Sequence, residues 1–219
     1  MEKRALTDHV YSEVSRISKL FSNPHRLEII DLIANGPKSV EDIATETGIS
    51  IANASQHLQS LKKERLVDTH RKGTRIFYRL VSDQVYMTAK SLRDLALSIS
   101  PYVQMTINEF KKESGYIDSY SLDPLMNSED LVFIDVRPED EFESGHIPNA
   151  LSIPIKDLEL KINDIPKDKL IIAYCRGMFC TYADEAVQLL NQKGFKAMKL
   201  DQSVFEYQNT SLADFTDYS

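Results

Sequence analysis

The sequence predicts two domains, a helical domain closed by a β-hairpin and then an α/β domain with helices on both faces of a parallel sheet. Three observations predict this division. The 219 residues are enough for two domains of ordinary size. Apolar residues recur at helical spacing in the first half, whereas continuous apolar runs alternate with helices in the second. The charge also changes, because residues 1–100 hold 15 Lys and Arg against 12 Asp and Glu, and residues 101–219 hold 11 against 21.

Composition restricts the class of protein further. With 42% hydrophobic and 27% charged residues, the chain is typical of globular proteins. No apolar run reaches the ~18 residues of a membrane span, and the start MEKRALTDH is too polar for a signal peptide. We therefore expect a cytoplasmic protein with no membrane partner. The two cysteines are too few for a disulfide scaffold, and their close spacing in CRGMFC indicates a site.

The first half is predicted to contain four helices before its hairpin. Their expected ranges are 6–21, 25–34, 39–48 and a fourth that starts at Ser50. Capping residues mark the third of them, because Ser39 is followed three positions later by Asp42, and Gly48 closes the helix.

A hairpin and one more helix complete the first domain. After Leu66 the apolar period changes to about two, and the two short strands flank a turn at Lys72-Gly73. A helix over 83–99 follows. We therefore place the first domain at 1–100 and a linker at 101–116.

The second domain is predicted over 117–219. Apolar runs typical of buried parallel strands lie at 131–136 and 170–174, and a further strand is expected at 196–200. An amphipathic helix over 181–192 ends at Gly194. This alternation favours a parallel sheet with helices on both faces.

The helices and the hairpin together form a winged helix-turn-helix, which reads DNA. Between Leu61 and Leu80 the chain holds seven basic and two acidic residues, a surplus that suits a polyanion. The fourth helix would enter the major groove, where Asn and Gln side chains contact adenine, and basic side chains would contact phosphates. The expected DNA-binding residues are Asn53, Ser55, Gln56, His57, Lys62, Lys63, Arg71, Lys72 and Arg75. The alternative is a small helical bundle with a solvated basic face.

At these residues the sequence resembles the ArsR/SmtB family of winged-helix repressors. The matching stretch covers about 60 residues, from LFSNPHRLEII through SQHL to KGTRIFYRL. The resemblance implies a homodimer built on the first and last helices of the domain. Its two recognition helices would address an inverted repeat in a double-stranded DNA operator.

The resemblance does not extend to metal sensing. Members that bind soft metals carry thiolates near the start of the helix at Ser39, where this chain has Ser39 and Glu41. A second family site uses acids and histidines on the last helix, and 83–99 holds no histidine. The five histidines are scattered without metal-ligand spacing. We expect no metal site and no cofactor.

The second domain carries a candidate nucleophile in a short loop. The strand that ends at Tyr174 and the helix that begins at Thr181 enclose a loop whose first residue is Cys175. Loop N–H groups and the helix dipole would lower the pKa of this thiol and stabilise a persulfide. The expected anion-cradle loop is Arg176, Gly177, Met178, Phe179 and Cys180. Cys180 is either a resolving thiol or a small residue at the helix start, and the alternative for Cys175 is a buried structural cysteine.

Two stretches of the second half resemble the rhodanese family of sulfurtransferases. These are FIDVRPEDEFESGHIPNALSIP and YCRGMFCTYADEAVQLLNQKGFKAMKL. The resemblance implies that Cys175 accepts sulfur from small sulfur species and that Asp135 and Arg137 hold the scaffold together. Where the family commonly has Gly-Gly and then Trp, this chain has Gln202-Ser203 and Tyr207. Related phosphatases need a longer loop ending in arginine, which Thr181 does not supply.

We therefore expect a DNA-binding transcriptional repressor whose rhodanese-like domain accepts or senses sulfane sulfur as a Cys175 persulfide. The alternative is a sulfurtransferase that uses thiosulfate or a persulfide and carries an accessory DNA-binding domain. A third option is a redox switch that forms a Cys175–Cys180 disulfide without sulfur transfer.

Overall fold

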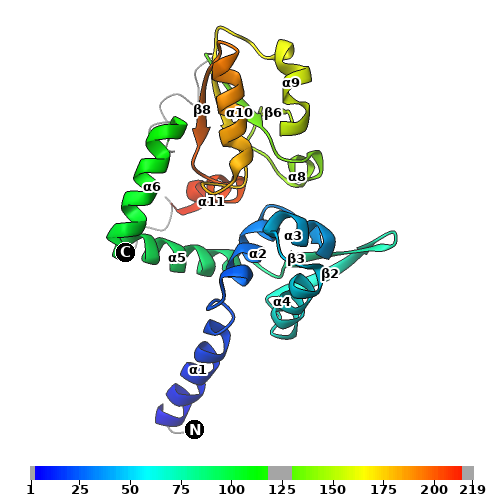
Figure 1. Ribbon diagram of the computed structural model, residues 1–219. Helices are drawn as coiled ribbons and strands as arrows, with labels where there is room; N and C mark the ends of the chain where they lie inside the picture. Colours follow the sequence, from blue (N-terminus) through cyan, green and yellow to red (C-terminus); the bar gives the residue numbers. More distant parts are fainter. Residues whose placement is uncertain (1–2, 118–129, 214–219) are drawn as a thin grey trace. The chain divides into compact units, whose positions relative to one another are not determined.

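The computed structural model describes residues 3–117 and 130–213 and divides into two compact units, Met1–Ala96 and Leu97–Ser219 (Figure 1). The first unit has one hydrophobic core and the second has two. No helix in the described ranges is long and apolar enough to cross a membrane.

The first unit packs helices around a three-stranded antiparallel sheet of order β1-β3-β2. Helices α3 and α4 are the helix-turn-helix pair, and β2 and β3 form the wing. This confirms the predicted winged helix-turn-helix. The elements are α1 (Lys3–Ser18), α2 (Pro24–Ala34), β1 (Lys38–Ser39), α3 (Val40–Thr47), α4 (Ile51–Lys63), β2 (Val67–Lys72), β3 (Arg75–Leu80) and α5 (Asp83–Ile99).

Side-chain caps set the boundaries of the helix-turn-helix, as the sequence predicts. The Ser39 hydroxyl accepts a hydrogen bond from the Asp42 N–H at 3.2 Å, and the Asp42 carboxylate accepts one from the Ser39 N–H at 3.3 Å. Gly48 ends α3 in the left-handed conformation, with φ of 68°. Ser50 then caps α4 by accepting from the N–H of Asn53.

Two local features of this unit differ from the prediction. The strand β1 has only two residues, too few for an apolar period to show, and it pairs with β3. Helix α1 ends at Ser18, three residues before the predicted end. Its continuation is broken because Leu20 and Phe21 turn into the core, where they are 9% and 6% exposed.

The second unit is built on a five-stranded sheet of order β4-β8-β7-β5-β6, in which every pair is parallel. The elements are α6 (Pro101–Ser114), β4 (Tyr116–Ile117), β5 (Leu131–Asp135), α8 (Glu139–Ser144), β6 (Leu151–Ser152), the 3-10 turns η2 (Ile155–Asp157) and η3 (Ile162–Asp164), α9 (Leu158–Lys161), β7 (Leu170–Tyr174), α10 (Thr181–Gln192), β8 (Lys196–Leu200) and α11 (Val204–Ala213).

The two faces of this sheet pack against different helices. Ile171 and Ala173 of β7 share a core with the buried side of α10, including Ala183. Ile172 and Tyr174, which point to the opposite face, share a second core with residues that include the first residue of α11. The predicted sheet with helices on both faces is confirmed.

The segment 101–116, which is predicted to be a linker, holds the helix α6. Ser100 caps this helix by accepting from the N–H of Val103, and Gly115 ends it with φ of 64°. Lys111 of α6 forms an ion pair with Asp201 at 2.7 Å. Contacts of this kind group the helix with the second unit, so the two compact units divide at Ala96 and Leu97.

A buried ion pair holds the end of β5. The guanidinium of Arg137 donates to both carboxylate oxygens of Asp135, at 3.0 and 2.7 Å, and to the carbonyl of Gly145 at 2.7 Å. Both side chains are at most 1% exposed. These contacts agree with the expected scaffold role of the pair.

Replacing Asp135 with Asn should destabilise the second unit by about 3–5 kcal/mol, because the Arg137 charge stays buried without its counterion. Amide hydrogen exchange in β5 and β7 across a urea series measures this unit separately. The matched control is Glu159→Gln, since Glu159 belongs to a surface pair with Lys193 and is 74% exposed. A loss below about 1 kcal/mol for Asp135→Asn would show that the pair is not essential to this unit.

Candidate functional site

The recognition helix α4 buries one side and presents the other. Its buried side chains Ala54, Leu58 and Leu61 are each 0% exposed, as the helical spacing predicts. The expected DNA-binding residues lie on the remaining surface. Gln56, Lys62 and Lys63 are exposed, and Asn53, Ser55 and His57 are partly buried.

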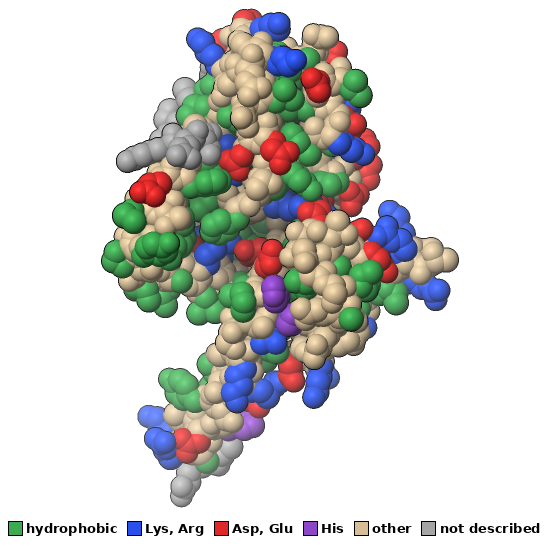
Figure 2. Space-filling model, viewed as in Figure 1, with side chains coloured by type: hydrophobic (Ala, Val, Ile, Leu, Met, Phe, Trp, Pro, Cys, Tyr) green, Lys and Arg blue, Asp and Glu red, His purple; other side chains and the backbone are tan. Residues whose placement is uncertain are grey.

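The wing carries three of the expected phosphate contacts, all exposed: Arg71, Lys72 and Arg75. Figure 2 shows Lys and Arg side chains gathered around the end of the hairpin. Arg71 folds back to the carbonyl of Gly73 at 3.1 Å. Lys62 of α4 donates to the Thr69 hydroxyl at 2.7 Å and so links helix and wing.

Arg75 forms an ion pair with an acidic side chain of its own unit. Its guanidinium donates to the Ser39 hydroxyl at 2.6 Å and to both Asp42 carboxylate oxygens at 2.9 Å. Partial burial raises the pKa of Asp42, but hydrogen bonds from Ser39 and Arg75 outweigh it and leave that pKa below its ordinary value. Arg75 thus ties the wing to the cap of α3.

Neighbouring groups act on the pKa of His57, another of the expected DNA contacts. Partial burial lowers the pKa of His57, and the nearby charges of Arg26 and His25 lower it further. The rings of His25 and His57 lie 5.7 Å apart. A neutral imidazole donates a hydrogen bond but adds no positive charge to the interface.

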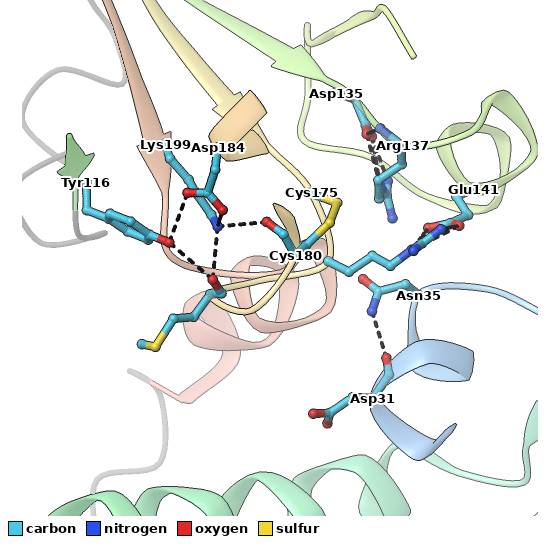
Figure 3. The surroundings of a disulfide bond; sticks show 12 residues. Asp31, Asn35, Tyr116, Asp135, Arg137, Glu141, Cys175, Cys180, Asp184 and Lys199 are labelled. Carbon is cyan, nitrogen blue, oxygen red and sulfur yellow. Dashed lines mark hydrogen bonds and ion pairs between the residues drawn. A yellow bond between two sulfur atoms is a disulfide. The ribbon is translucent and has the colours of Figure 1, made fainter. Parts of the chain in front are cut away.

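The second candidate site is the loop between β7 and α10. Cys175 follows the last residue of β7 and is 0% exposed, and Cys180 immediately precedes α10 and is partly buried. The structure joins their sulfurs in a disulfide (Figure 3).

Arg176, a residue of the expected anion-cradle loop, pairs its charge with an acidic side chain. It forms a two-pronged ion pair with Glu141, with contacts of 2.9 and 2.5 Å, and the side chains are 10% and 1% exposed. The buried Glu141 carboxylate requires a cation, and Arg176 supplies it. The guanidinium also lies over the Tyr182 ring, 5.4 Å from its centre.

Gly177 lies beside the turn before α11 in a left-handed backbone conformation that favours glycine. Its φ is +107°, and an added Cβ would lie 3.5 Å from the backbone nitrogen of Ser203. Ser203 in turn caps α11, because its hydroxyl accepts from the Glu206 N–H at 3.1 Å. This serine stands where the resemblance predicts a glycine, and here it pairs with Arg176 in a β-bridge. Between the two cysteines Phe179 is 61% exposed, whereas Met178 is partly buried.

A buried lysine lies behind the loop, and nothing in the motifs pointed to it. Lys199 of β8 is 0% exposed and donates to the carbonyls of Met178 and Cys180 at 2.9 and 2.8 Å. Its third hydrogen bond goes to Asp184 of α10 at 2.7 Å. Burial lowers the pKa of Lys199, although Asp184 opposes this effect. The alternation of β8, which puts Lys199 on the same face as the buried Ala197, is the one signal that could have found it.

Comparisons with known proteins match each half of the chain to the family that it was expected to resemble. A family model described as "Bacterial regulatory protein, arsR family" matches residues 23–69, and one described as "Rhodanese-like domain" matches residues 119–210. A sulfurtransferase of Allochromatium vinosum is 36% identical over 80 residues, which cover 36% of this chain and 73% of that protein.

One solved structure and one full-length relative complete the comparison. The solution structure of a homodimeric winged helix-turn-helix DNA-binding domain of Mycobacterium bovis is 34% identical and covers 47% of this chain and 93% of that one, with a TM-score of 0.42. The HTH-type transcriptional regulator Rv0324 of Mycobacterium tuberculosis is 34% identical over 225 residues, which cover 96% of this chain and 92% of that protein. The chain therefore belongs to the family of HTH-type transcriptional regulators in which an ArsR-type helix-turn-helix domain precedes a rhodanese-like domain.

Proposed function

We propose that this regulator is a cytoplasmic repressor that binds an operator as a homodimer and responds to sulfane sulfur through Cys175. The observation that carries the proposal is the loop of the second unit, where a buried cysteine at a strand end is within bonding distance of a second cysteine at a helix start. The first unit contains no cysteine, so a sulfur signal has no thiol to react with there.

The first chemical step is the transfer of one sulfur atom to Cys175. With thiosulfate as donor, the Cys175 thiolate attacks the outer sulfur, the S–S bond of thiosulfate breaks, and sulfite leaves with the bonding electrons. The product is a persulfide anion on Cys175. Backbone N–H groups of a strand-to-helix loop stabilise such an anion.

Cys180 would then resolve the persulfide. Its thiolate attacks the inner sulfur of the Cys175 persulfide, the outer sulfur leaves as hydrosulfide, and the Cys175–Cys180 disulfide forms. The disulfide of the structure joins the same two sulfurs that this step would join, which supports the proposal. A thiol reductant restores the site by attacking Cys180, which is partly exposed while Cys175 is not, so that Cys175 leaves as the thiolate.

The apolar surface of the first unit supports a dimer of DNA-binding domains. A groove between α1 and α5 is lined by apolar side chains that include Val14, Ile17, Phe21 and Leu92. Along α1, Tyr11 is 69% exposed and Val14 is 53% exposed, which leaves an amphipathic helix without cover. A second copy of the chain would bury this surface and place two α4 helices on the two halves of an inverted repeat.

The rival proposal is a sulfurtransferase with an accessory DNA-binding domain. The 36% identity of the second unit to a sulfurtransferase favours it. Repeated conversion of thiosulfate and cyanide to sulfite and thiocyanate would support the rival, whereas a single loading of sulfur per site supports a sensor.

The DNA-binding residues can be separated by salt dependence. Lys72→Ala should weaken binding to all DNA sequences and shallow the salt slope by about one unit, because one phosphate contact is lost. Gln56→Ala should instead reduce discrimination between sites by about 1–3 kcal/mol. Fluorescence anisotropy with operator and random DNA over a salt series measures both.

The matched wing control is Arg75→Ala. Because Asp42 and Ser39 already hold this guanidinium, its loss should weaken binding without changing the salt slope. A slope that falls as far as in Lys72→Ala would place Arg75 on a phosphate and contradict the role as a wing anchor.

The two cysteines should respond differently to a sulfur donor. Cys175→Ser should abolish the gain of 32 Da per sulfur that intact mass spectrometry reads after treatment with thiosulfate or polysulfide. Cys180→Ser should hold the loaded sulfur longer than the unsubstituted protein, because the resolving thiol is missing. Normal loading in Cys175→Ser, or loss of the sulfur from Cys180→Ser at the unsubstituted rate, would contradict these assignments.

A further inference from the structure

The buried ammonium of Lys199 is placed to orient the loop that carries both cysteines. It has three N–H groups, and the described residues use all three: two go to loop carbonyls, of Met178 and Cys180, and one goes to Asp184. The Tyr116 hydroxyl lies 3.2 Å from the same Met178 carbonyl and 3.3 Å from Asp184. The Tyr116 ring also faces the ammonium, with its centre 4.9 Å from Nζ.

Because the peptide bond is planar, the direction of each of these carbonyl groups also fixes the direction of the N–H group of the next residue. In a trans peptide the C=O of one residue and the N–H of the next point in opposite directions, and none of the described peptide bonds is cis. Because Lys199 draws the carbonyls of Met178 and Cys180 inward, the N–H groups of Phe179 and Thr181 point away from it.

The sulfurs lie on that opposite side. Figure 3 shows the Cys180 carbonyl directed to Lys199, while the Cys180 side chain extends the other way to its bond with Cys175. In the described part of the chain no side chain caps the first turn of α10, so no capping side chain occupies the N–H groups of that turn. The charge of Arg176, the other cation at the loop, is already neutralised by Glu141.

We propose that Lys199 is a positioning residue for the sulfur site: it holds two loop carbonyls on the interior side and so aims the N–H groups of Phe179 and Thr181 at the sulfur of Cys175. The inference rests on the proposed sulfur chemistry. The inference adds to that chemistry a residue of β8, Lys199, that contacts neither the sulfur of Cys175 nor the sulfur donor. The Tyr116 hydroxyl assists at one of the two carbonyls.

The test compares Lys199→Met with Lys111→Met in the full-length, reduced protein. Both substitutions remove an ammonium near the Tyr116 ring, but Lys111 pairs with Asp201, and no hydrogen bond joins it to the loop. The first readout is the rate of sulfur loading from thiosulfate. The second is the pH profile of Cys175 alkylation by iodoacetamide. Trypsin cleaves after Arg176, so Cys175 and Cys180 lie in separate peptides and their alkylation is measured separately.

Lys199→Met should slow sulfur loading at least about tenfold, a fraction of what the loss of an oriented anion donor costs in enzymes. It should also move the midpoint of the Cys175 alkylation profile upward by about one pH unit, because misdirected N–H groups stabilise the thiolate less. Lys111→Met should change neither. A folded Lys199→Met protein with the unsubstituted rate and midpoint would overturn the proposal.

Tyr116→Phe keeps the proposal testable if Lys199→Met does not fold. It removes one hydroxyl from the Met178 carbonyl and should shift both readouts in the same direction by a smaller factor, about two- to fivefold in rate. If Lys199→Met does not fold, an unchanged rate and an unchanged midpoint in Tyr116→Phe would overturn the role of this network. If the unsubstituted protein takes up no sulfur, the proposed function fails, whereas the alkylation profile still decides the role of Lys199.

Discussion

The ammonium group of Lys199 is buried completely, and it finds two of its three hydrogen-bond acceptors in the loop that carries both cysteines. A buried cation without acceptors would destabilise the fold by several kcal/mol. The lysine therefore requires these hydrogen bonds, and the same hydrogen bonds fix the position of the two loop carbonyls. The same rule governs the other charges nearby: Arg176 is matched to Glu141, and Arg137 to Asp135. The shape of the loop that carries both cysteines follows from how these buried charges are paired.

Much of the fold is predictable because local signals mark it. Ser39, Gly48 and Ser50 lie at helix boundaries that their side chains or backbone conformation favour, and the structure has those boundaries. The runs at 131–136 and 170–174 contain the strands β5 and β7. By contrast, β1 and β4 have two residues each, and only pairing with distant strands defines them. Helix α6 was missed because Pro101 reads equally as a helix breaker and as a first-turn residue.

The identities of the site residues could be predicted from the sequence, but their hydrogen-bond and ion-pair partners could not. Cys175 and the loop length follow from the sequence, whereas the partners of Arg75 and Arg176 are acids 33 and 35 positions away. Lys199 was missed because two of its three acceptors are carbonyl groups, which carry no sequence signal. Contacts that depend on tertiary packing therefore changed the interpretation of Arg75 and Arg176 and added Lys199, although the motifs placed the loop between β7 and α10 correctly.

One chain combines a DNA-binding unit that has no cysteine with a unit that carries both of its cysteines. In a sensor of this kind, the modified and unmodified forms of the loop must favour the DNA-competent and incompetent states to different extents. Coupling free energies of about 1–3 kcal/mol are typical. The most direct test is operator affinity, measured on reduced protein and on polysulfide-treated protein, with Cys175→Ser treated in parallel. An inverted-repeat DNA selected with the reduced protein serves as operator. A shift of about 5–150-fold that is absent in Cys175→Ser is the predicted result. Equal affinity in all preparations would contradict sulfur sensing through Cys175.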